Sequence, residues 1–401
     1  MRYYIIAGEA SGDLHGSNLI RGLRMEDSDA EFRLWGGEKM LTAATEPTDT
    51  TLGPSATLVR DYKDTAVMGL TDVVFKMGKI IYNLFLCRKD ISKWKPDVVI
   101  LIDYPGFNMK IARFCHFHGI KVFWYIAPKT WASRSYRNCS LRRYVDRMFL
   151  IFPFEKPYFT KKNIPFIYKG NPLVDAIDNH EFTRVVDGDY VALLPGSRKG
   201  EISRMMPILM QVADLTGYKF VIAGAPGRTE ADYLKYIGGR KNVRLLFGET
   251  YNILKYANSA VINSGTASLE AALIGTPQIV GWNTSGLTYW AATKVLKVQK
   301  HIKYISLGNL IADAPIFKEL IQDALRSEVV AMELGQLRRP DYRQEMLDGY
   351  AVIRDLLGGG GASRAVASSM IDELHLIGND RWSLAGTLKK DIKTIFTGKK
   401  Q

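Results

Sequence analysis

The chain has 401 residues, more than one hydrophobic core usually holds, and this length predicts two domains. Apolar residues make up 47% and charged residues 24%, so the composition excludes disordered and fibrous classes. No apolar run approaches the roughly 18–20 residues that span a bilayer. Three cysteines without a Cys-x-x-Cys pair indicate neither a disulfide framework nor a zinc site, and we expect no metal. The net charge of +13 gathers in patches such as residues 129–147, which suit a phosphate-bearing partner or are ordinary solvated side chains.

In the first half of the chain, strands and helices alternate. Residues 3–7 form the first predicted strand, and a glycine-rich turn leads into a helix near residues 15–25. Val98–Ile102 is an unbroken apolar run, which is typical of a strand buried on both faces of a parallel sheet. Two further strands are predicted at Lys121–Tyr125 and Arg147–Ile151. The alternation indicates an α/β fold with parallel strands.

The second half repeats this pattern after a polar stretch at residues 178–189. Gly358–Gly361 then breaks the chain before a last predicted helix near residues 364–376. We therefore expect an α/β protein with two Rossmann-like, doubly wound domains that face a central cleft. The domains are residues 1–185 and 186–360, and residues 361–401 are a C-terminal helix and basic tail that packs back on the first domain. The strands predicted in the second domain are Tyr190–Leu194, Lys219–Ala223, Val243–Phe247, Ala260–Ile262 and Gln278–Gly281.

The first strand is followed by a loop, residues 8–16, that carries Glu9, Asp13 and His15 between three glycines. Its spacing is not Gly-x-Gly-x-x-Gly, and the chain has no Gly-Lys-Ser/Thr loop, so neither a nicotinamide cofactor nor an ATPase is expected. Acidic side chains repel phosphate and suit a hydroxyl-rich substrate or proton transfer. Alternatively, Asp13 caps the following helix.

Two turns of the second domain are better suited to phosphate. Gly196, Ser197 and Arg198 follow a predicted strand and offer backbone N–H groups, a hydroxyl and a guanidinium. The second turn places hydroxyls at a helix start, with a carboxylate one turn inside that can accept two sugar hydroxyls. Either turn alone could be an ordinary helix cap. Both lie at strand carboxyl ends, where α/β sheets bind ligands, and this favours a nucleotide site. The residues of the second turn are Ser264, Gly265, Thr266 and Glu270.

Asp103 directly follows the apolar run Val98–Ile102. A lone carboxylate at the carboxyl end of a central strand lies where reacting groups are placed, and partial burial would raise its pKa toward that of a general base. The alternative is an Asx-turn that enters the loop before Pro105.

An ordered set of motifs along nearly the whole chain resembles the lipid-A-disaccharide synthase family. The set comprises residues 7–16 (AGEASGDLHG), Gly36-Gly37, Met68-Gly69-Leu70, Pro96-Asp97, Ile102-Asp103 with Phe107-Asn108, Trp131-Ala132, Pro153-Phe154-Glu155, residues 193–198 (LLPGSR) with Glu201-Ile202, Ser264-Gly265-Thr266-Ala267 with Leu269-Glu270, and Ser306-Leu307 with Asn309. Departures from the family pattern are Gly106, Asn171, Gly308 and the turn Ala127-Pro128-Lys129, which stands where a serine-rich turn is usual.

The resemblance implies a glycosyltransferase of the GT-B fold. It would move 2,3-diacylglucosamine from UDP to the 6-hydroxyl of 2,3-diacylglucosamine 1-phosphate with inversion, and no cofactor is expected. Asp103 would be the base, with Glu9, Asp13 and His15 beside it, and Asn309 would hold the nucleotide or the acceptor phosphate. The implied location is cytoplasmic and peripheral, at the inner face of the cytoplasmic membrane, with a possible homodimer and no nucleic acid.

Residues 70–86 predict an amphipathic helix. Leu70, Val73, Val74, Met77, Ile81, Leu84 and Phe85 follow the spacing of a core-facing stripe. The opposite side is apolar but carries Lys79, which is expected of a helix at a lipid headgroup boundary. The alternative is a helix buried on both sides. The residues predicted to meet acyl chains are Val67, Met68, Phe75, Tyr82 and Leu86.

Two rival functions remain. The first is another UDP-sugar enzyme of the same fold, either a UDP-sugar 2-epimerase or a different lipid glycosyltransferase, and dependence on detergent would separate the soluble epimerase. The second is a non-catalytic protein that binds nucleic acid or a membrane through the basic patches. The acids and histidine of the first loop argue against RNA in the cleft.

Overall fold

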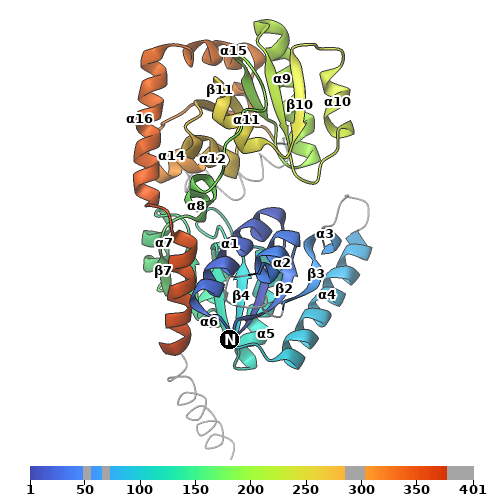
Figure 1. Ribbon diagram of the computed structural model, residues 1–401, viewed down its shortest axis with the longest axis vertical. Helices are drawn as coiled ribbons and strands as arrows, with labels where there is room; N and C mark the ends of the chain where they lie inside the picture. Colours follow the sequence, from blue (N-terminus) through green and yellow to red (C-terminus); the bar gives the residue numbers. More distant parts are fainter. Residues whose placement is uncertain (48–55, 66–72, 285–302, 377–401) are drawn as a thin grey trace, which may run out of the picture.

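The computed structural model describes residues 1–47, 56–65, 73–284 and 303–376. Two parallel sheets, each flanked by helices, form two domains that lie one above the other along the long axis (Figure 1). The predicted α/β class with two doubly wound domains is thereby confirmed.

The first domain is built on seven strands in the order β3-β2-β1-β4-β5-β6-β7, and every neighbouring pair is parallel. β1 and β4 lie side by side from Tyr3 opposite Val98 to Ala7 opposite Ile102. All five residues of β4 are buried, as its unbroken apolar sequence predicts. The strands are β1 (Arg2–Ala7), β2 (Glu31–Gly36), β3 (Ala56–Asp61), β4 (Val98–Ile102), β5 (Lys121–Tyr125), β6 (Arg147–Leu150) and β7 (Phe166–Tyr168).

Helices cover both faces of this sheet. Along β1, Tyr3, Ile5 and Ala7 belong to one buried cluster, and Tyr4 and Ile6 belong to a second one on the other face. The described helices of this domain are α1 (Ala10–Glu26), α2 (Glu38–Thr45), α3 (Tyr62–Thr65), α4 (Val73–Trp94), α5 (Pro105–Phe117), α6 (Asn138–Tyr144), α7 (Glu155–Lys161) and α8 (Pro172–Asp178), with a 3₁₀ turn at Ser135–Arg137.

The second domain has six parallel strands in the order β10-β9-β8-β11-β12-β13. They are β8 (Val191–Leu194), β9 (Phe220–Gly224), β10 (Val243–Phe247), β11 (Ser259–Asn263), β12 (Gln278–Trp282) and β13 (Glu319–Ile321). The described helices are α9 (Lys199–Thr216), α10 (Ala231–Ile237), α11 (Thr250–Tyr256), α12 (Thr266–Ile274), α14 (Leu307–Ala312), α15 (Ser327–Gln336) and α16 (Pro340–Leu357).

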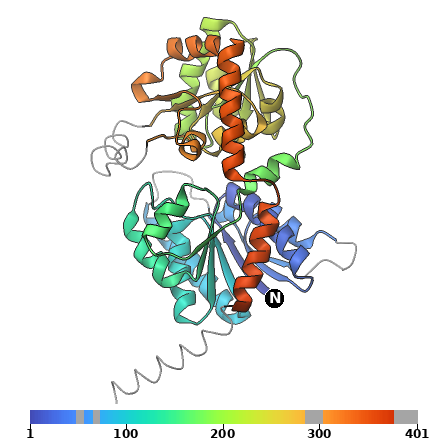
Figure 2. The ribbon, with the colours of Figure 1, turned by 90° about the vertical axis from the view of Figure 1, so that its left-hand side faces the viewer.

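The chain returns to the first domain after α16. The helix at residues 362–376 runs along the lower domain, in line with α16 on the upper one (Figure 2). Arg147 forms an ion pair with Glu373 at 2.6 Å, and Lys121 Nζ donates a hydrogen bond to the Leu374 carbonyl at 2.8 Å. The last described helix therefore fastens the second domain's end to the first domain.

The orientation of α4 differs from the predicted one. Leu84, Cys87 and Ile91 are buried, whereas Ile81 and Phe85, which were expected in the core, are 62% and 63% exposed. The helix carries apolar residues on nearly every side. The pattern therefore predicts a helix but does not indicate which of its faces packs against the core. Of the predicted acyl-contacting residues, Tyr82 is exposed and Leu86 is half-buried against the core. Val67 and Met68, together with the side chain of Phe75, lie outside the described residues.

Candidate active site

The two sheets present their switch points to one shared cleft. In each sheet the strand order reverses between the first and fourth strands, β1 and β4 in one and β8 and β11 in the other. Ligands of open α/β sheets bind at the carboxyl ends of such strands. The loops that follow these strands line a cleft of about 1650 Å³ between the domains. Every predicted catalytic or substrate-binding residue lies in this lining except Asn309.

Asp103 occupies an unusual backbone turn at the end of β4. Asp103 and Tyr104 are both left-handed, with φ of +42° and +44°. Such residues cost of order 1–3 kcal/mol each and persist only where the surroundings impose them. Here Asn108, which is buried, donates from Nδ2 to the Asp103 carbonyl at 2.8 Å, and Asp103 N–H donates to the Tyr125 carbonyl at 3.2 Å. These hydrogen bonds hold the Asp103 backbone in its left-handed conformation at the cleft.

The environment of Asp103 favours proton acceptance. The side chain is half-buried, and desolvation raises the pKa of its carboxyl above the ordinary value. Lys129 works against this shift by stabilising the carboxylate, whereas Glu9 adds to it. Asp103 therefore combines a raised basicity with a position at the switch point.

A glycine makes room for the neighbouring ring. A Cβ atom on Gly8 would lie 2.3 Å from the Tyr104 ring, so only glycine allows that ring to pack over the first loop. The Tyr104 ring also stacks on Phe107 with centroids 5.5 Å apart. The Tyr104 ring therefore packs directly against the first loop and joins that loop to the Asp103 turn.

Asp13 stabilises the fold rather than standing free in the cleft. Its carboxylate accepts backbone N–H bonds from Gly37 at 2.8 Å, Met40 at 3.1 Å and Lys39 at 3.3 Å. These donors belong to the amino end of α2, so Asp13 caps α2 and not α1, which was the alternative predicted from sequence. These three N–H bonds give Asp13 a structural role at the junction of α1 and α2, and its assistance to Asp103 stays a prediction.

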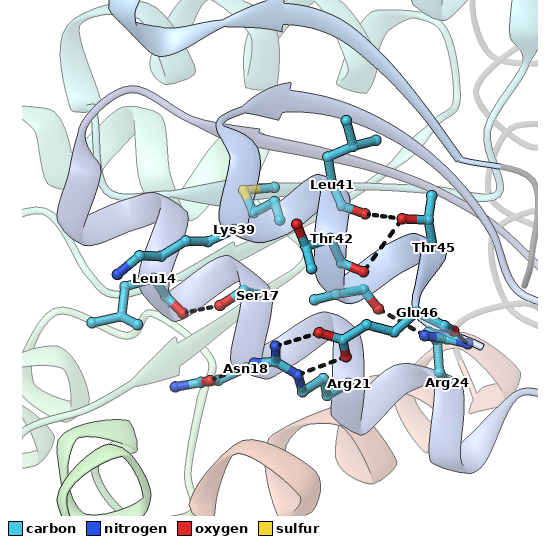
Figure 3. A network of polar contacts seen from close by, with 12 residues as sticks. Leu14, Ser17, Asn18, Arg21, Arg24, Lys39, Leu41, Thr42, Thr45 and Glu46 are labelled. Atoms are coloured by element: carbon cyan, nitrogen blue, oxygen red, sulfur yellow. Dashed lines mark hydrogen bonds and ion pairs between the residues drawn. The ribbon is translucent and has the colours of Figure 1, made fainter. Parts of the chain in front are cut away.

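The same junction of α1 and α2 is reinforced on its outer side (Figure 3). Arg21 binds both carboxylate oxygens of Glu46, at 2.9 and 3.2 Å, and Arg24 donates to the Ala43 carbonyl at 2.8 Å. These contacts join α1, which follows the first loop, to the carboxyl end of α2.

His15 is buried in the cleft wall at 6% exposure. Burial lowers the pKa of its imidazole to about 4, so the ring is neutral near pH 7. Its Nδ1 finds no hydrogen-bond partner among the described residues. Because burial disfavours the charged imidazolium, His15 accepts a proton less readily than an ordinary histidine.

The turn after β8 is closed by an internal carboxylate. Glu201 accepts the N–H bonds of Ser197 at 3.0 Å and Arg198 at 3.2 Å, and pairs with the Arg198 guanidinium at 3.1 Å. The Ser197 and Arg198 amides are therefore not free for phosphate, contrary to the prediction from sequence. Gly196, at φ +115°, permits this closure because a Cβ there would lie 2.7 Å from Glu201. The Arg198 side chain is 74% exposed in the cleft wall and can turn toward a ligand.

The turn after β11 opens α12 toward the cleft. Ser264 donates its hydroxyl to the Ile305 carbonyl at 3.1 Å, Gly265 precedes the helix, and Thr266 is exposed at its first turn. The unpaired N–H groups and dipole of a helix start attract anions. Further along α12, Glu270 accepts a hydrogen bond from the Tyr251 hydroxyl of α11 at 3.3 Å, and burial raises the pKa of the Glu270 carboxyl to about 7.

Asn309 is not part of this cleft. It is buried, its Nδ2 donates to the Phe317 carbonyl at 2.9 Å and to Glu319 at 3.0 Å, and its Oδ1 accepts the Phe317 N–H. Its amide is saturated by contacts of α14 with β13 and with the segment before β13, which gives Asn309 a structural role, and its role toward a ligand stays a prediction. Among the described residues, no cluster of His, Cys, Asp and Glu could hold a metal ion.

The structure places part of the basic patch at residues 129–147 in the cleft. Lys129, Arg134 and Arg137, on the segment after β5, belong to the same lining as Asp103. Their signal in the sequence was the excess of basic residues over 129–147, which by itself could not be separated from a solvated surface.

Comparison with known proteins agrees with this geometry. Residues 3–347 match the family model described as lipid-A-disaccharide synthetase. A lipid-A-disaccharide synthase from Geobacter metallireducens is 34% identical over 388 residues, covering 93% of this chain and 97% of that protein. One from Syntrophus aciditrophicus is 36% identical, covering 90% and 95%. A solved structure described as a putative UDP-N-acetylglucosamine 2-epimerase from Listeria monocytogenes has a TM-score of 0.60 at 13% identity, covering 95% and 98%, and shows the shared fold alone.

Two facing Rossmann-like domains with their switch points on one cleft define a GT-B protein. The match over nearly the whole length makes the assignment narrower. The chain belongs to the lipid-A-disaccharide synthase family and is a disaccharide-forming glycosyltransferase.

Proposed function

We propose that the cleft joins UDP-2,3-diacylglucosamine to the 6-hydroxyl of 2,3-diacylglucosamine 1-phosphate, with Asp103 as the general base. The supporting observation is that the switch points of the two sheets line one cleft and carry side chains of different chemistry. On one side stands a carboxylate of raised pKa, Asp103, and on the other stand an exposed guanidinium, Arg198, and the open start of α12.

In the proposed reaction, Asp103 takes the proton of the acceptor 6-hydroxyl. The freed oxygen forms a bond to the anomeric carbon of the donor while the bond from that carbon to UDP breaks, which inverts the configuration. The electron pair leaves with UDP, and Arg198 and the N–H groups at Thr266 stabilise the charge as it develops. Glu270 would accept hydroxyls of the nucleotide sugar.

The reaction is tested by following UDP release with each substrate omitted in turn. We expect release of UDP only when both acylated glucosamine substrates are present. The mass of the product should equal the sum of the two substrates, UDP-sugar and acceptor, less the mass of UDP. Release or conversion of the UDP-sugar without the acceptor would contradict it and favour an epimerase or a hydrolase.

The electrostatics of Asp103 predict opposite pH shifts for two variants. A base works while deprotonated, so activity falls as the pH drops through its pKa. Lys129→Met removes a cation that lowers this pKa, and the acidic limb of kcat/KM should move to higher pH. Glu9→Gln removes an anion that raises it, and the limb should move to lower pH. Acidic limbs that stay in place in both variants would show that Asp103 does not set the profile.

We further propose that the outer face of α4 meets the membrane. Ile81, Tyr82 and Phe85 are 62%, 58% and 63% exposed on adjacent turns, and Lys79 and Lys89 are exposed beside them. Neighbouring exposed apolar groups with flanking lysines suit an anionic lipid surface. No described helix is long and apolar enough to cross a membrane.

Serine at Ile81, Tyr82 and Phe85 together should weaken binding to anionic phospholipid vesicles by at least roughly tenfold, since each side chain loses its apolar transfer energy. The melting temperature should change little because all three are exposed. Leu215→Ser on α9 is the matched control, since Leu215 is 58% exposed on the other domain. Sedimentation with vesicles measures the binding of the triple variant and of the control. Unchanged binding of the triple variant would refute the assignment of this face.

A further inference from the structure

The segment that follows β5 forms one wall of the cleft beside Asp103. β5 pairs with β4, and its last residue, Tyr125, accepts the Asp103 N–H. Ile126 is left-handed at φ +64°, a costly conformation for a β-branched residue that turns the chain out of the sheet. Three basic side chains from this segment, Lys129, Arg134 and Arg137, line the cleft.

These three cations make no ion pair or side-chain hydrogen bond with any residue that the structure describes. Other arginines of the cleft lining are neutralised. Arg21 pairs with Glu46 at 2.9 Å, and Arg364 pairs with Glu26 at 2.8 Å. Arg198 pairs with Glu201 on the donor side. Among the described residues, cations without an ion-pair partner are therefore concentrated on the acceptor side of the cleft.

The segment is held by buried polar contacts. Thr130 donates to Asn138 Oδ1 at 2.8 Å, Asn138 Nδ2 donates to Tyr158 at 2.7 Å, and Tyr158 donates back to the Thr130 carbonyl at 2.8 Å. Thr130 and Asn138 are almost completely buried. The Trp131 indole donates to buried Glu155 at 3.2 Å. The basic side chains thus project from a fixed backbone, which lowers the entropy cost of binding an anion.

We propose that Lys129, Arg134 and Arg137 form the subsite for a phosphate monoester, the 1-phosphate of the acceptor sugar. The inference rests on the proposed function, which places the acceptor 6-hydroxyl at Asp103. The 1-phosphate is carried at the opposite end of the same sugar ring, so a cationic site on the Asp103 side of the cleft fits it. A phosphate monoester carries about −1.5 to −2 charges near neutral pH, and arginine forks match its oxygens in bidentate geometry.

Phosphate on an anionic lipid headgroup has the same chemistry, and the experiment separates the two sources. The probe is 2,3-diacylglucosamine with and without its 1-phosphate, presented in uncharged detergent micelles that contain no phospholipid. The test variant is Arg134→Gln with Arg137→Gln, which keeps Lys129, the cation that lowers the pKa of Asp103. The matched control is Arg142→Gln with Arg143→Gln, the same charge change on exposed residues of α6 outside the cleft lining.

The subsite predicts that the test variant loses roughly ten- to a hundredfold in kcat/KM for the phosphorylated acceptor through a higher KM. With the acceptor that lacks phosphate, the test variant and the wild type should agree within about twofold, and the control variant should match the wild type with both. Equal losses on both acceptors, or no loss, would overturn the subsite. Loss of binding to anionic vesicles without any change in micelles would assign these arginines to headgroups and also overturn it.

A binding measurement keeps this result separate from the proposed function. Calorimetric titration of both acceptors in the same micelles should show tighter binding of the phosphorylated form by the wild type and loss of that preference in the test variant. A wild-type protein that shows the preference but makes no disaccharide would leave the subsite standing and refute the proposed reaction. One that makes disaccharide without the preference would refute the subsite alone.

Discussion

Replacing Asp103 by asparagine is expected to lower kcat by roughly 10²–10⁴-fold, the usual loss when a general base is removed. Asparagine has nearly the same shape and tolerates the left-handed backbone found at this position, so the turn should persist. UDP affinity should remain close to that of the wild type, because the nucleotide is proposed to bind across the cleft. Steady-state rates of UDP release and calorimetric titration with UDP measure the two quantities.

The matched control for this variant is Asp97→Asn. Asp97 is exposed just before β4, at the opposite end of the strand, where it accepts the Arg2 N–H at 2.8 Å. It should keep kcat within about twofold of the wild type. If Asp103→Asn retained more than a tenth of wild-type activity, Asp103 would not be the base.

The second large effect is expected at Arg198. Its guanidinium is 74% exposed in the cleft wall and is paired only with Glu201 among the described residues, so it can turn to the diphosphate. Arg198→Ala should weaken UDP binding by roughly ten- to a hundredfold, the range for a charged hydrogen bond, and should also slow transfer.

Lys199→Ala provides the comparison, because Lys199 is 71% exposed, pairs with Asp232 and lies outside the cleft lining. It should change UDP affinity little in a calorimetric titration. Unchanged UDP affinity in Arg198→Ala would restrict Arg198 to closing the turn with Glu201 or to the acceptor side.

The sequence predicted those parts of the fold that depend on local pattern. The buried run Val98–Ile102 is β4, and the turns at Gly196 and Ser264 follow strands β8 and β11 as expected. The position of Asp103 followed from the same pattern. Carboxyl ends of parallel strands share one sheet edge, so a strand assignment already places the residue that comes after it.

The sequence could not predict which face of a helix packs against the core, or which of several groups takes a given hydrogen bond in the folded chain. The carboxylate of Asp13 reaches α2, 24 residues further along, and only the packed fold shows which helix it caps. Glu201 takes amides that a phosphate would otherwise use. Periodicity could not orient α4, whose apolar residues occur on every side, and Asn309 is saturated by β13 and the segment before it.

The configuration of the product tests the central claim most directly. Wild-type protein would be incubated with the two acylated glucosamines in uncharged detergent, and the product examined by mass spectrometry and by NMR of the anomeric proton. A single displacement aided by Asp103 predicts a disaccharide 1-phosphate with a β-1′,6 linkage, inverted relative to the donor. An α-linked disaccharide, or a UDP-sugar changed at its second carbon with no disaccharide, would contradict the account.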